Sequence, residues 1–162
     1  MLAAVAGAAH ATDLTLIGSM DGRDFYVSAN YYNIPDAEAL ASSVGGNLAT
    51  IASQAEQDWL LDGSRAGSAE LFWIGYTRTS SGGPFAWEDG STATYTNWNG
   101  GEPNNAGDER NTVMNWGSHG AWNDWNEANT ARVLVTTQAV PEPATMAALG
   151  VGALGLLRRR KR

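Results

Sequence analysis

Residues 97–111 read NWNGGEPNNAGDERN, and this stretch decides the fold. Eleven of the fifteen residues are Asn, Gly, Asp or Glu, and they follow neither a helical nor a strand period. A loop of this length without secondary structure is either functional or disordered. Trp98 near its start and Trp116 and Trp122 beyond its end argue against disorder. We therefore expect an ordered loop that is held in shape by something other than a hydrophobic core.

A hard cation would hold the loop, because the loop is rich in oxygen ligands. Calcium takes about 6–8 oxygen ligands and accepts carboxylates and amide carbonyls. Five such side chains, with a total charge of −3, are the candidate ligands: Glu102, Asn104, Glu109, Asn123 and Asp124. They leave coordination positions open, which two neighbouring sugar hydroxyls would fill. Each hydroxyl would also donate to a carboxylate and accept from an amide, as Glu102 with Asn104, and Glu109 with Asn123, allow.

The sequence before the loop predicts two helices. The first helix is expected to begin at Pro35-Asp36 and to end at Gly45-Gly46. Between them, four apolar residues occur at helical spacing: Ala37, Leu40, Ala41 and Val44. Ser53 and Glu56 form a capping box for a second helix that reaches Leu61. The apolar face expected for this second helix consists of Ala55, Trp59 and Leu60.

Strands are expected on both sides of these helices. The segments with strand character are 24–28, 71–76, 84–87, 92–98 as a continuation, and 132–136. Helices followed by a run of strands, without a βαβ alternation, indicate an α+β fold. Trp73, Trp87 and Trp98 are expected in the core, with Trp122 beneath the site.

The chain resembles the C-type lectin-like family in a series of motifs that occur in the family's order. These are Gly45–Ile51, Glu56-Gln57-Asp58, Trp73-Ile74-Gly75, Trp87–Gly90, Asn97-Trp98, Gly101–Asn105 and Trp122-Asn123-Asp124. The resemblance implies two helices, a mainly antiparallel sheet and a long calcium-binding loop. It also implies a cis peptide bond before Pro103, and the five candidate ligands as both the calcium and the carbohydrate site.

Glu102-Pro103-Asn104 goes with mannose-type sugars in that family, whereas Gln-Pro-Asp goes with galactose-type sugars. Two departures from the family pattern affect the transfer. The chain has no Cys, so the disulfides of animal members are missing and calcium would contribute more of the loop's order. The auxiliary calcium site of some members needs acidic residues where this chain has Asn105 and Arg110, so we expect one calcium site.

Composition excludes several classes of function. Up to Val140 the chain carries 16 acidic and 5 basic residues. The resulting negative charge repels phosphate backbones and argues against nucleic-acid binding. Without Cys there is no thiolate metal site or Cys nucleophile, and His10 and His119 alone leave little room for His-based catalysis. A glycosidase needs two carboxylates across a cleft, but clustered carboxylates are better explained as ligands. We therefore expect a binding protein and no enzyme.

Both ends of the chain resemble targeting segments around a domain that spans 12–139. Residues 1–11 resemble a secretory signal peptide with a small-x-small site at Ala9-His10-Ala11, although its positive start is missing. The peptide either begins further upstream or is atypical; the other reading is an alanine-rich terminus. Residues 140–162 contain Pro141-Glu142-Pro143, an apolar run and five basic residues, and resemble the PEP-CTERM sorting signal of exported bacterial proteins. The alternative for this tail is a weak membrane anchor.

The resemblance implies an exosortase-type processing enzyme, a transient inner-membrane anchor through the apolar run, and a final place in the bacterial envelope or outside the cell. The favoured function is calcium-dependent binding of a glycan or exopolysaccharide. The alternative is a structural or protein-binding module that uses the same fold without sugar. Other residues have secondary expectations: Glu88, Asp108 and His119 are expected to be solvated, and Trp116 and Trp125 either pack or border the sugar site.

Overall fold

The structure is a computed structural model that describes residues 13–62 and 70–139, so the expected signal peptide and sorting tail lie outside the described residues. Its elements, in chain order, are β1 (Leu14–Met20), β2 (Arg23–Ser28), α1 (Ile34–Ser43), β3 (Asn47–Leu48), α2 (Gln54–Leu61), β4 (Phe72–Ile74), β5 (Tyr76–Thr77), β6 (Ala86–Trp87), β7 (Asn111–Met114), the 3-10 turn η3 (Ser118–Gly120), β8 (Asn123–Trp125) and β9 (Arg132–Gln138). Among the residues described, no helix is long and apolar enough to cross a membrane.

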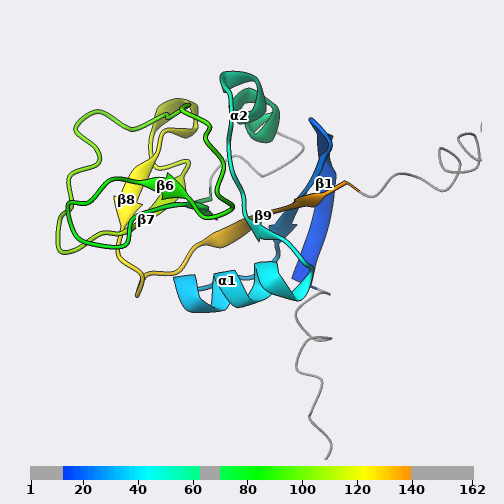
Figure 1. The fold of residues 1–162 in the computed structure, drawn as a ribbon, viewed down its shortest axis with the longest axis horizontal. Helices are drawn as coiled ribbons and strands as arrows, with labels where there is room; N and C mark the ends of the chain where they lie inside the picture. Colours follow the sequence, from blue (N-terminus) through cyan, green and yellow to red (C-terminus); the bar gives the residue numbers. More distant parts are fainter. Residues whose placement is uncertain (1–12, 63–69, 140–162) are drawn as a thin grey trace, which may run out of the picture.

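One sheet of seven strands organises the domain. Six of its strands lie in the order β1-β2-β9-β4-β7-β8, β3 pairs with β9, and β5 and β6 form a separate ribbon. Every pairing is antiparallel except that of β4 with β9. The predicted α+β class with a mainly antiparallel sheet is confirmed. In Figure 1, α1 lies on one side of β9 and α2 on the other, and the loops around β6, β7 and β8 occupy the opposite end from β1.

The first helix forms where the sequence predicts it. The side chain of Asn33 accepts a hydrogen bond from the Asp36 amide at 3.0 Å, and Pro35 occupies the first turn, where its missing N–H is not needed. The chain leaves the helix through Gly45, whose positive φ of 71° favours glycine. The buried residues Ile34, Ala37, Leu40 and Ala41 pack α1 against the sheet.

The second helix has the predicted cap and part of the predicted buried face. Ser53 accepts from the Glu56 amide at 3.2 Å, which confirms the cap. Ala55 is exposed, and the buried residues are Glu56, Gln57 and Leu60. Of the predicted face, Leu60 is buried and Trp59 packs against the core, so only Ala55 is wrong. Glu56 and Gln57 are buried in addition because polar partners compensate their burial: Glu56 pairs with Arg23, and Gln57 bonds to the Gly120 carbonyl and to Trp122 Nε1.

The strand predictions hold in part. Segments 24–28, 84–87 and 132–136 fall on β2, β6 and β9, and 71–76 divides into β4 and β5 at Gly75. A Cβ at Gly75 would lie 2.6 Å from the Leu48 carbonyl oxygen, so only glycine fits this approach. Segment 92–98 is not a strand, because its polar groups bond locally: Ala93 donates to Ser91 Oγ and accepts from Trp87 Nε1. Sequence analysis did not predict β1, β3, β7 or β8.

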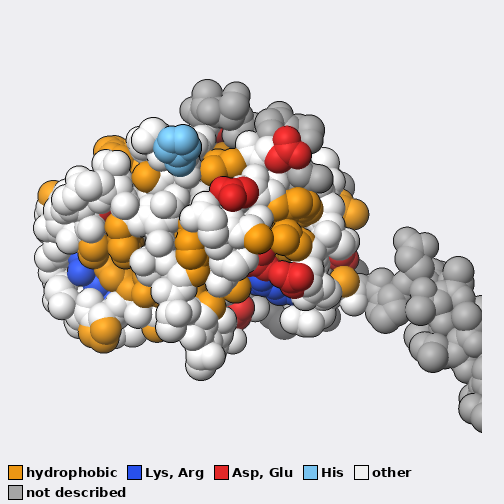
Figure 2. All heavy atoms as spheres, turned by 90° about the horizontal axis from the view of Figure 1, so that it is seen from above, with side chains coloured by type: hydrophobic (Ala, Val, Ile, Leu, Met, Phe, Trp, Pro, Cys, Tyr) orange, Lys and Arg blue, Asp and Glu red, His pale blue; other side chains and the backbone are white. Residues whose placement is uncertain are grey.

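Two hydrophobic clusters fill the domain, and one of them lies next to the long loop. Trp73 is fully buried on the α1 side, and Trp87 and Trp122 are buried on the α2 side, as expected. Aromatic rings with centroids 4.6–6.0 Å apart connect β5, β6 and the loops up to the residue before β8: Tyr76, Phe85, Trp87, Tyr95, Trp98 and Trp122. Trp98 is half-buried within this aromatic cluster. On the face shown in Figure 2, hydrophobic side chains reach the surface in separate small areas.

Candidate functional site

The long loop, residues 97–111, leaves and rejoins the fold at fixed points. At its start, Asn99 N donates to the Trp122 carbonyl at 2.8 Å and Trp122 N donates to the Asn97 carbonyl at 2.7 Å. At its end, Asn111 begins β7, which pairs with β8. The Glu102–Pro103 peptide bond is cis, as the resemblance implies. The loop therefore lies beside β8, the strand that carries Asn123 and Asp124.

Asp124 is the centre of the site. Its carboxylate is fully buried, and it accepts from the backbone amides of Asn104 at 3.0 Å and Asn105 at 2.9 Å. Its Oδ2 also accepts from the guanidinium of Arg78 at 2.9 Å. A buried carboxylate is tolerated only with such partners. Asp124 thus holds the loop just after the cis-proline.

Consecutive backbone amides converge on the acidic side chains. Asn104 N donates to Glu102 Oε2 at 3.0 Å as well as to Asp124. Ala106 N donates to Glu109 Oε2 at 2.9 Å and to Asn104 Oδ1 at 2.8 Å. The structure therefore brings Glu102, Asn104, Glu109 and Asp124 together through one short segment of backbone.

The pKa values of the two glutamates of this group are raised, chiefly by desolvation. The pKa of Glu102 is raised, first by desolvation and then by the charge of Asp124. The pKa of Glu109 is raised by desolvation and by the charges of Asp124 and Glu102, against a hydrogen bond from the Ala106 amide that lowers it. Like charges at short range disfavour ionisation. The three carboxylates therefore form one negatively charged region.

Asn123, the residue before Asp124 on β8, carries an unsatisfied group. Its side chain is 4% exposed, and its Oδ1 has no hydrogen-bond partner among the described residues. Buried polar atoms without a partner are rare and cost free energy. Asn123 precedes Asp124 on β8 and faces Val113 of β7 in the register. An amide oxygen of this kind is a suitable ligand for a hard cation.

The donor set fits calcium only when the amides are included. In the part of the chain that the structure describes, no three His, Cys, Asp or Glu side chains lie close enough to hold a metal ion by themselves. A mixed set of carboxylates and the amide oxygens of Asn104 and Asn123 is the composition that calcium accepts. In Glu102 and Glu109 the amide bonds use only Oε2. Oxygen atoms thus remain for a cation.

Arg78 belongs to the site and was missed by the sequence analysis. Its Nε donates to the Glu109 carbonyl at 2.9 Å, and its Nη2 donates to Asn105 Oδ1 at 2.6 Å and to Asp124. Only 8% of the residue is exposed. The available signal was a single basic residue two positions after the predicted strand 71–76, in a region poor in basic residues.

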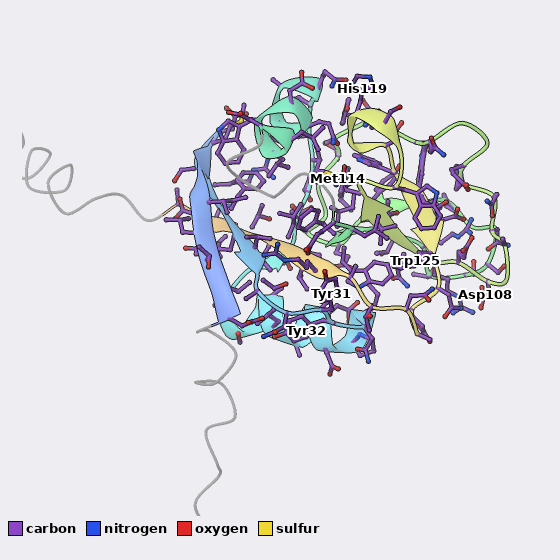
Figure 3. All side chains as sticks on the ribbon, turned by 180° about the vertical axis from the view of Figure 1, so that it is seen from behind. Tyr31, Tyr32, Asp108, Met114, His119 and Trp125 are labelled. Carbon is purple, nitrogen blue, oxygen red and sulfur yellow. The ribbon has the colours of Figure 1, made fainter. Side chains whose placement is uncertain are left out.

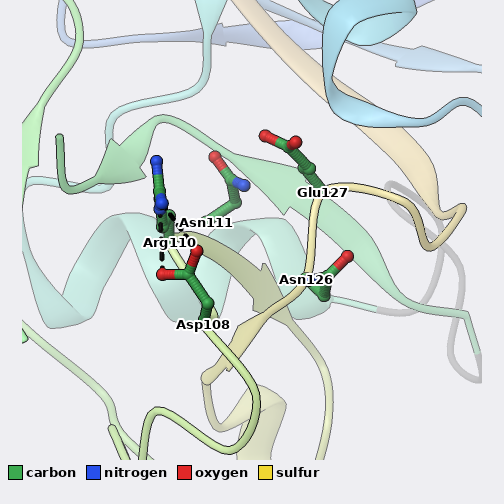
Figure 4. A pocket seen from close by; sticks show the side chains of 5 residues that line it. All are labelled: Asp108, Arg110, Asn111, Asn126 and Glu127. Atoms are coloured by element: carbon green, nitrogen blue, oxygen red, sulfur yellow. Dashed lines mark hydrogen bonds and ion pairs between the residues drawn. The ribbon is translucent and has the colours of Figure 1, made fainter. Parts of the chain in front are cut away.

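A small polar pocket of about 70 Å³ lies next to the candidate ligands and is lined by Asp108, Arg110, Asn111, Asn126 and Glu127 (Figure 4). Arg110 donates to both oxygens of Asp108, at 3.0 and 2.6 Å. The pKa of Asp108 is lowered, first by this hydrogen bond from Arg110. Because the Asp108 carboxylate already has a cationic partner, a metal cation is disfavoured at this pocket.

Three polar residues and two tryptophans are not among the candidate ligands. Asp108 and His119 are exposed. Glu88 is exposed by surface area, but desolvation raises the pKa of its carboxyl to about 7, so its solvation is only partial. Trp125 packs on buried Trp73 with centroids 5.4 Å apart, and Trp116, 43% exposed, packs edge-on against Trp125 at 5.7 Å. Figure 3 shows Trp125 and Asp108 at the long-loop end of the molecule and His119 at a separate position near α2. Trp125 therefore has a packing role.

Comparison with known proteins identifies two regions of the chain. The family model for the lectin C-type domain matches residues 30–134, and the model for the PEP-CTERM protein-sorting motif matches residues 139–162. The low affinity immunoglobulin epsilon Fc receptor of Mus musculus is 43% identical over 88 residues, which are 54% of this chain and 25% of the receptor. The chain spans between a quarter and about half of the length of the curated relatives that it matches first.

Solved structures share the fold over most of the domain. The C-type lectin CEL-I from Cucumaria echinata has a TM-score of 0.69 and 25% identity, covering 78% of this chain and 96% of that one. A calcium-independent type II antifreeze protein has a TM-score of 0.68 and 26% identity, covering 79% of this chain and 93% of that one.

Proposed function

The chain belongs to the C-type lectin domain family and carries a PEP-CTERM sorting motif, and from this we propose that it is an exported protein that binds carbohydrate through calcium. The proposed ligands of both calcium and sugar are Glu102, Asn104, Glu109, Asn123 and Asp124. The proposed preference is for mannose-type sugars.

The unpartnered Oδ1 of Asn123 is the observation that carries this proposal. A buried amide oxygen without a partner is unfavourable, as is a set of like-charged carboxylates, and a divalent cation bound by both would relieve both costs. Calcium, when bound, would supply positive charge and open coordination positions for two hydroxyl groups. The residues of the chain would then orient those hydroxyl groups by accepting and donating hydrogen bonds.

The polarity of Glu102 and Asn104 supports the mannose-type preference. Asn104 Oδ1 accepts from the Ala106 amide, so Nδ2 is the atom left to donate to a sugar hydroxyl. Glu102 accepts the Asn104 amide through Oε2, which leaves Oε1 to accept from a hydroxyl. One acceptor and one donor, on the two sides of Pro103, match the order that the Glu-Pro-Asn resemblance implies.

The sorting motif gives the proposal its cellular setting. Residues 139–162 match a protein-sorting motif, which supports export and processing by an exosortase-type enzyme. A membrane association through residues 144–157 would precede that processing. Outside the cell, the acidic lectin domain would hold a glycan or exopolysaccharide. Weak single sites of this kind would gain avidity from several copies on one surface.

A second candidate function is a structural or protein-binding role without sugar. The calcium-independent antifreeze protein shows that this fold also occurs without calcium dependence. The ion pair of Arg78 with Asp124 favours this alternative in one respect, because it neutralises part of the proposed calcium site. Neither candidate involves catalysis.

Binding to a glycan panel, in millimolar calcium and in chelator, tests the proposal. We expect mannose-type glycans to bind in calcium and to be released by chelator. Glu102→Gln should abolish this binding, whereas Glu88→Gln, which removes a carboxylate from an exposed position outside the site, should retain it. Equal glycan binding in calcium and chelator, or none in either, would favour the second candidate.

A further inference from the structure

Arg78 connects the long loop with β8, two segments that are distant from it in the sequence. One guanidinium contacts the Glu109 carbonyl, Asn105 Oδ1 and Asp124 Oδ2, so it bridges the second half of the long loop and β8. The planar guanidinium presents its donors in a fixed fork. Replacing it by a shorter or single-centred cation would therefore break part of this set.

The guanidinium is itself held in place from the other side. Its carbon lies 4.6 Å from the centre of the Phe85 ring, and Phe85 packs against Trp98 and Tyr76 at 5.0 and 5.4 Å. The backbone amide of Arg78 donates to the Arg110 carbonyl at 2.9 Å. The aromatic cluster thus helps to hold the guanidinium in place while its N–H groups contact the loop.

Arg110 provides the contrast within the same loop. Its side chain is 44% exposed and pairs with Asp108, which is 46% exposed and two residues away. In Figure 4 this pair lies at the polar pocket. An exposed local pair contributes little to order. Arg78 and Arg110 therefore carry the same charge, but only Arg78 joins the loop to another part of the fold.

We propose that Arg78 is a positioning residue that orders the long loop and the Asp124 carboxylate before any cation binds, and so reduces the loop's dependence on calcium. This inference rests on the proposed function, because the loop that Arg78 orders is the proposed binding site. Since the chain has no Cys, no disulfide restrains this loop. The guanidinium provides a noncovalent restraint in which its charge is matched by a buried carboxylate.

Hydrogen exchange of the Asn104, Asn105 and Ala106 amides, measured in chelator, tests the inference. These three amides donate to the carboxylates of the site, so their protection reports the order of the loop. In Arg78→Met we expect their protection to fall by about tenfold or more, because charge-assisted hydrogen bonds are lost. In the matched control Arg110→Met, protection should stay within about twofold of the wild type.

Calcium separates a positioning role from a purely structural one. Millimolar calcium should return the protection of Arg78→Met toward the wild-type value, because the ion would neutralise the carboxylate that Arg78 leaves behind. Arg78→Lys keeps the charge without the fork and should show an intermediate loss in chelator. The amides of β9 provide the internal reference for global folding. If Arg78→Met also loses protection in β9, the whole domain has been destabilised. The same exchange measurement on Arg78→Lys then tests the inference in place of Arg78→Met.

The inference is overturned if Arg78→Met keeps wild-type protection in chelator, or if Arg78→Lys keeps it where Arg78→Met has also lost protection in β9. It is also overturned if Arg110→Met loses as much protection as Arg78→Met, or if calcium restores none. The chelator measurement contains no sugar. A wild-type protein that failed to bind glycans would therefore contradict the proposed function without changing this result.

Discussion

Trp122 Nε1 donates to Gln57 Oε1 at 2.9 Å, and both side chains are fully buried. Gln57 Nε2 in turn donates to the Gly120 carbonyl at 3.3 Å. Through one side-chain amide, α2 therefore holds the segment that leads into Asn123 and Asp124. The close packing leaves no room at Gly120, where a Cβ would lie 2.5 Å from Gln57 Nε2.

Replacing this amide should destabilise the domain. Gln57→Leu leaves the Trp122 N–H and the Gly120 carbonyl buried without partners, and such groups cost about 1–3 kcal/mol. Denaturant unfolding measures the loss. Gln54→Leu is the matched control, because Gln54 is exposed on the same helix, and it should change stability by about 0.5 kcal/mol or less. Equal stabilities of the two variants would contradict this account of Gln57.

Calcium should raise the melting temperature in a concentration-dependent way. An ion that binds only the folded state adds about 2.7 kcal/mol at one hundred times its Kd. Thermal unfolding in chelator and at increasing calcium measures this. Asn123→Ala, which removes the unpartnered oxygen, should weaken the calcium effect. An unchanged melting temperature from chelator to millimolar calcium would contradict a single calcium site.

The calcium effect should depend on pH. The pKa values of Glu102 and Glu109 are raised in the folded protein, so protonation favours the calcium-free fold. This contribution is fully present below the ordinary glutamate pKa of about 4.3 and is lost as pH rises through the raised values. Calcium needs the deprotonated carboxylates. The rise in melting temperature on adding calcium should therefore be larger at about pH 7.5 than at about pH 5. The opposite order would contradict the assignment of these two ligands.

Removal of residues 140–162 should separate sorting from folding. The Ala139 amide donates to the Gly22 carbonyl at 2.9 Å, which places the end of the described fold at this residue. A chain that ends at Ala139 should keep the thermal unfolding and calcium response of the full chain. It should lose membrane association in cell fractionation. Loss of cooperative unfolding in the shortened chain would show that the boundary at 139 is misplaced.

The elements that local sequence determines were the ones that could be predicted. Asn33 to Gly45 contains the cap, the proline, the apolar spacing and the terminating glycine of α1 within one short segment. The candidate ligands were recognisable because Glu-Pro-Asn and Trp-Asn-Asp are local motifs. The cis bond before Pro103 was implied by the resemblance and is present.

Contacts between distant residues could not be predicted in this way. Arg78 and Asp124 are 46 positions apart, and Gln57 and Trp122 are 65 apart, so no local period links them. The burial of Glu56 and Gln57 on α2 depends on partners in β2 and beyond the long loop, which apolar spacing does not show. β1 has a mixed burial pattern without a clean alternation, which concealed it.

The most direct measurement is glycan and calcium binding by the double variant Glu102→Gln, Asn104→Asp. The exchange keeps one negative charge and nearly the same volume, but it reverses the hydrogen-bond polarity around Pro103. Titration calorimetry should show that calcium still binds, whereas a mannose-type glycan that binds the wild type no longer does, because mismatched buried groups cost about 1–3 kcal/mol each. If the double variant binds both calcium and the same glycan as the wild type does, Glu102 and Asn104 do not select the sugar, and the proposed lectin site is wrong.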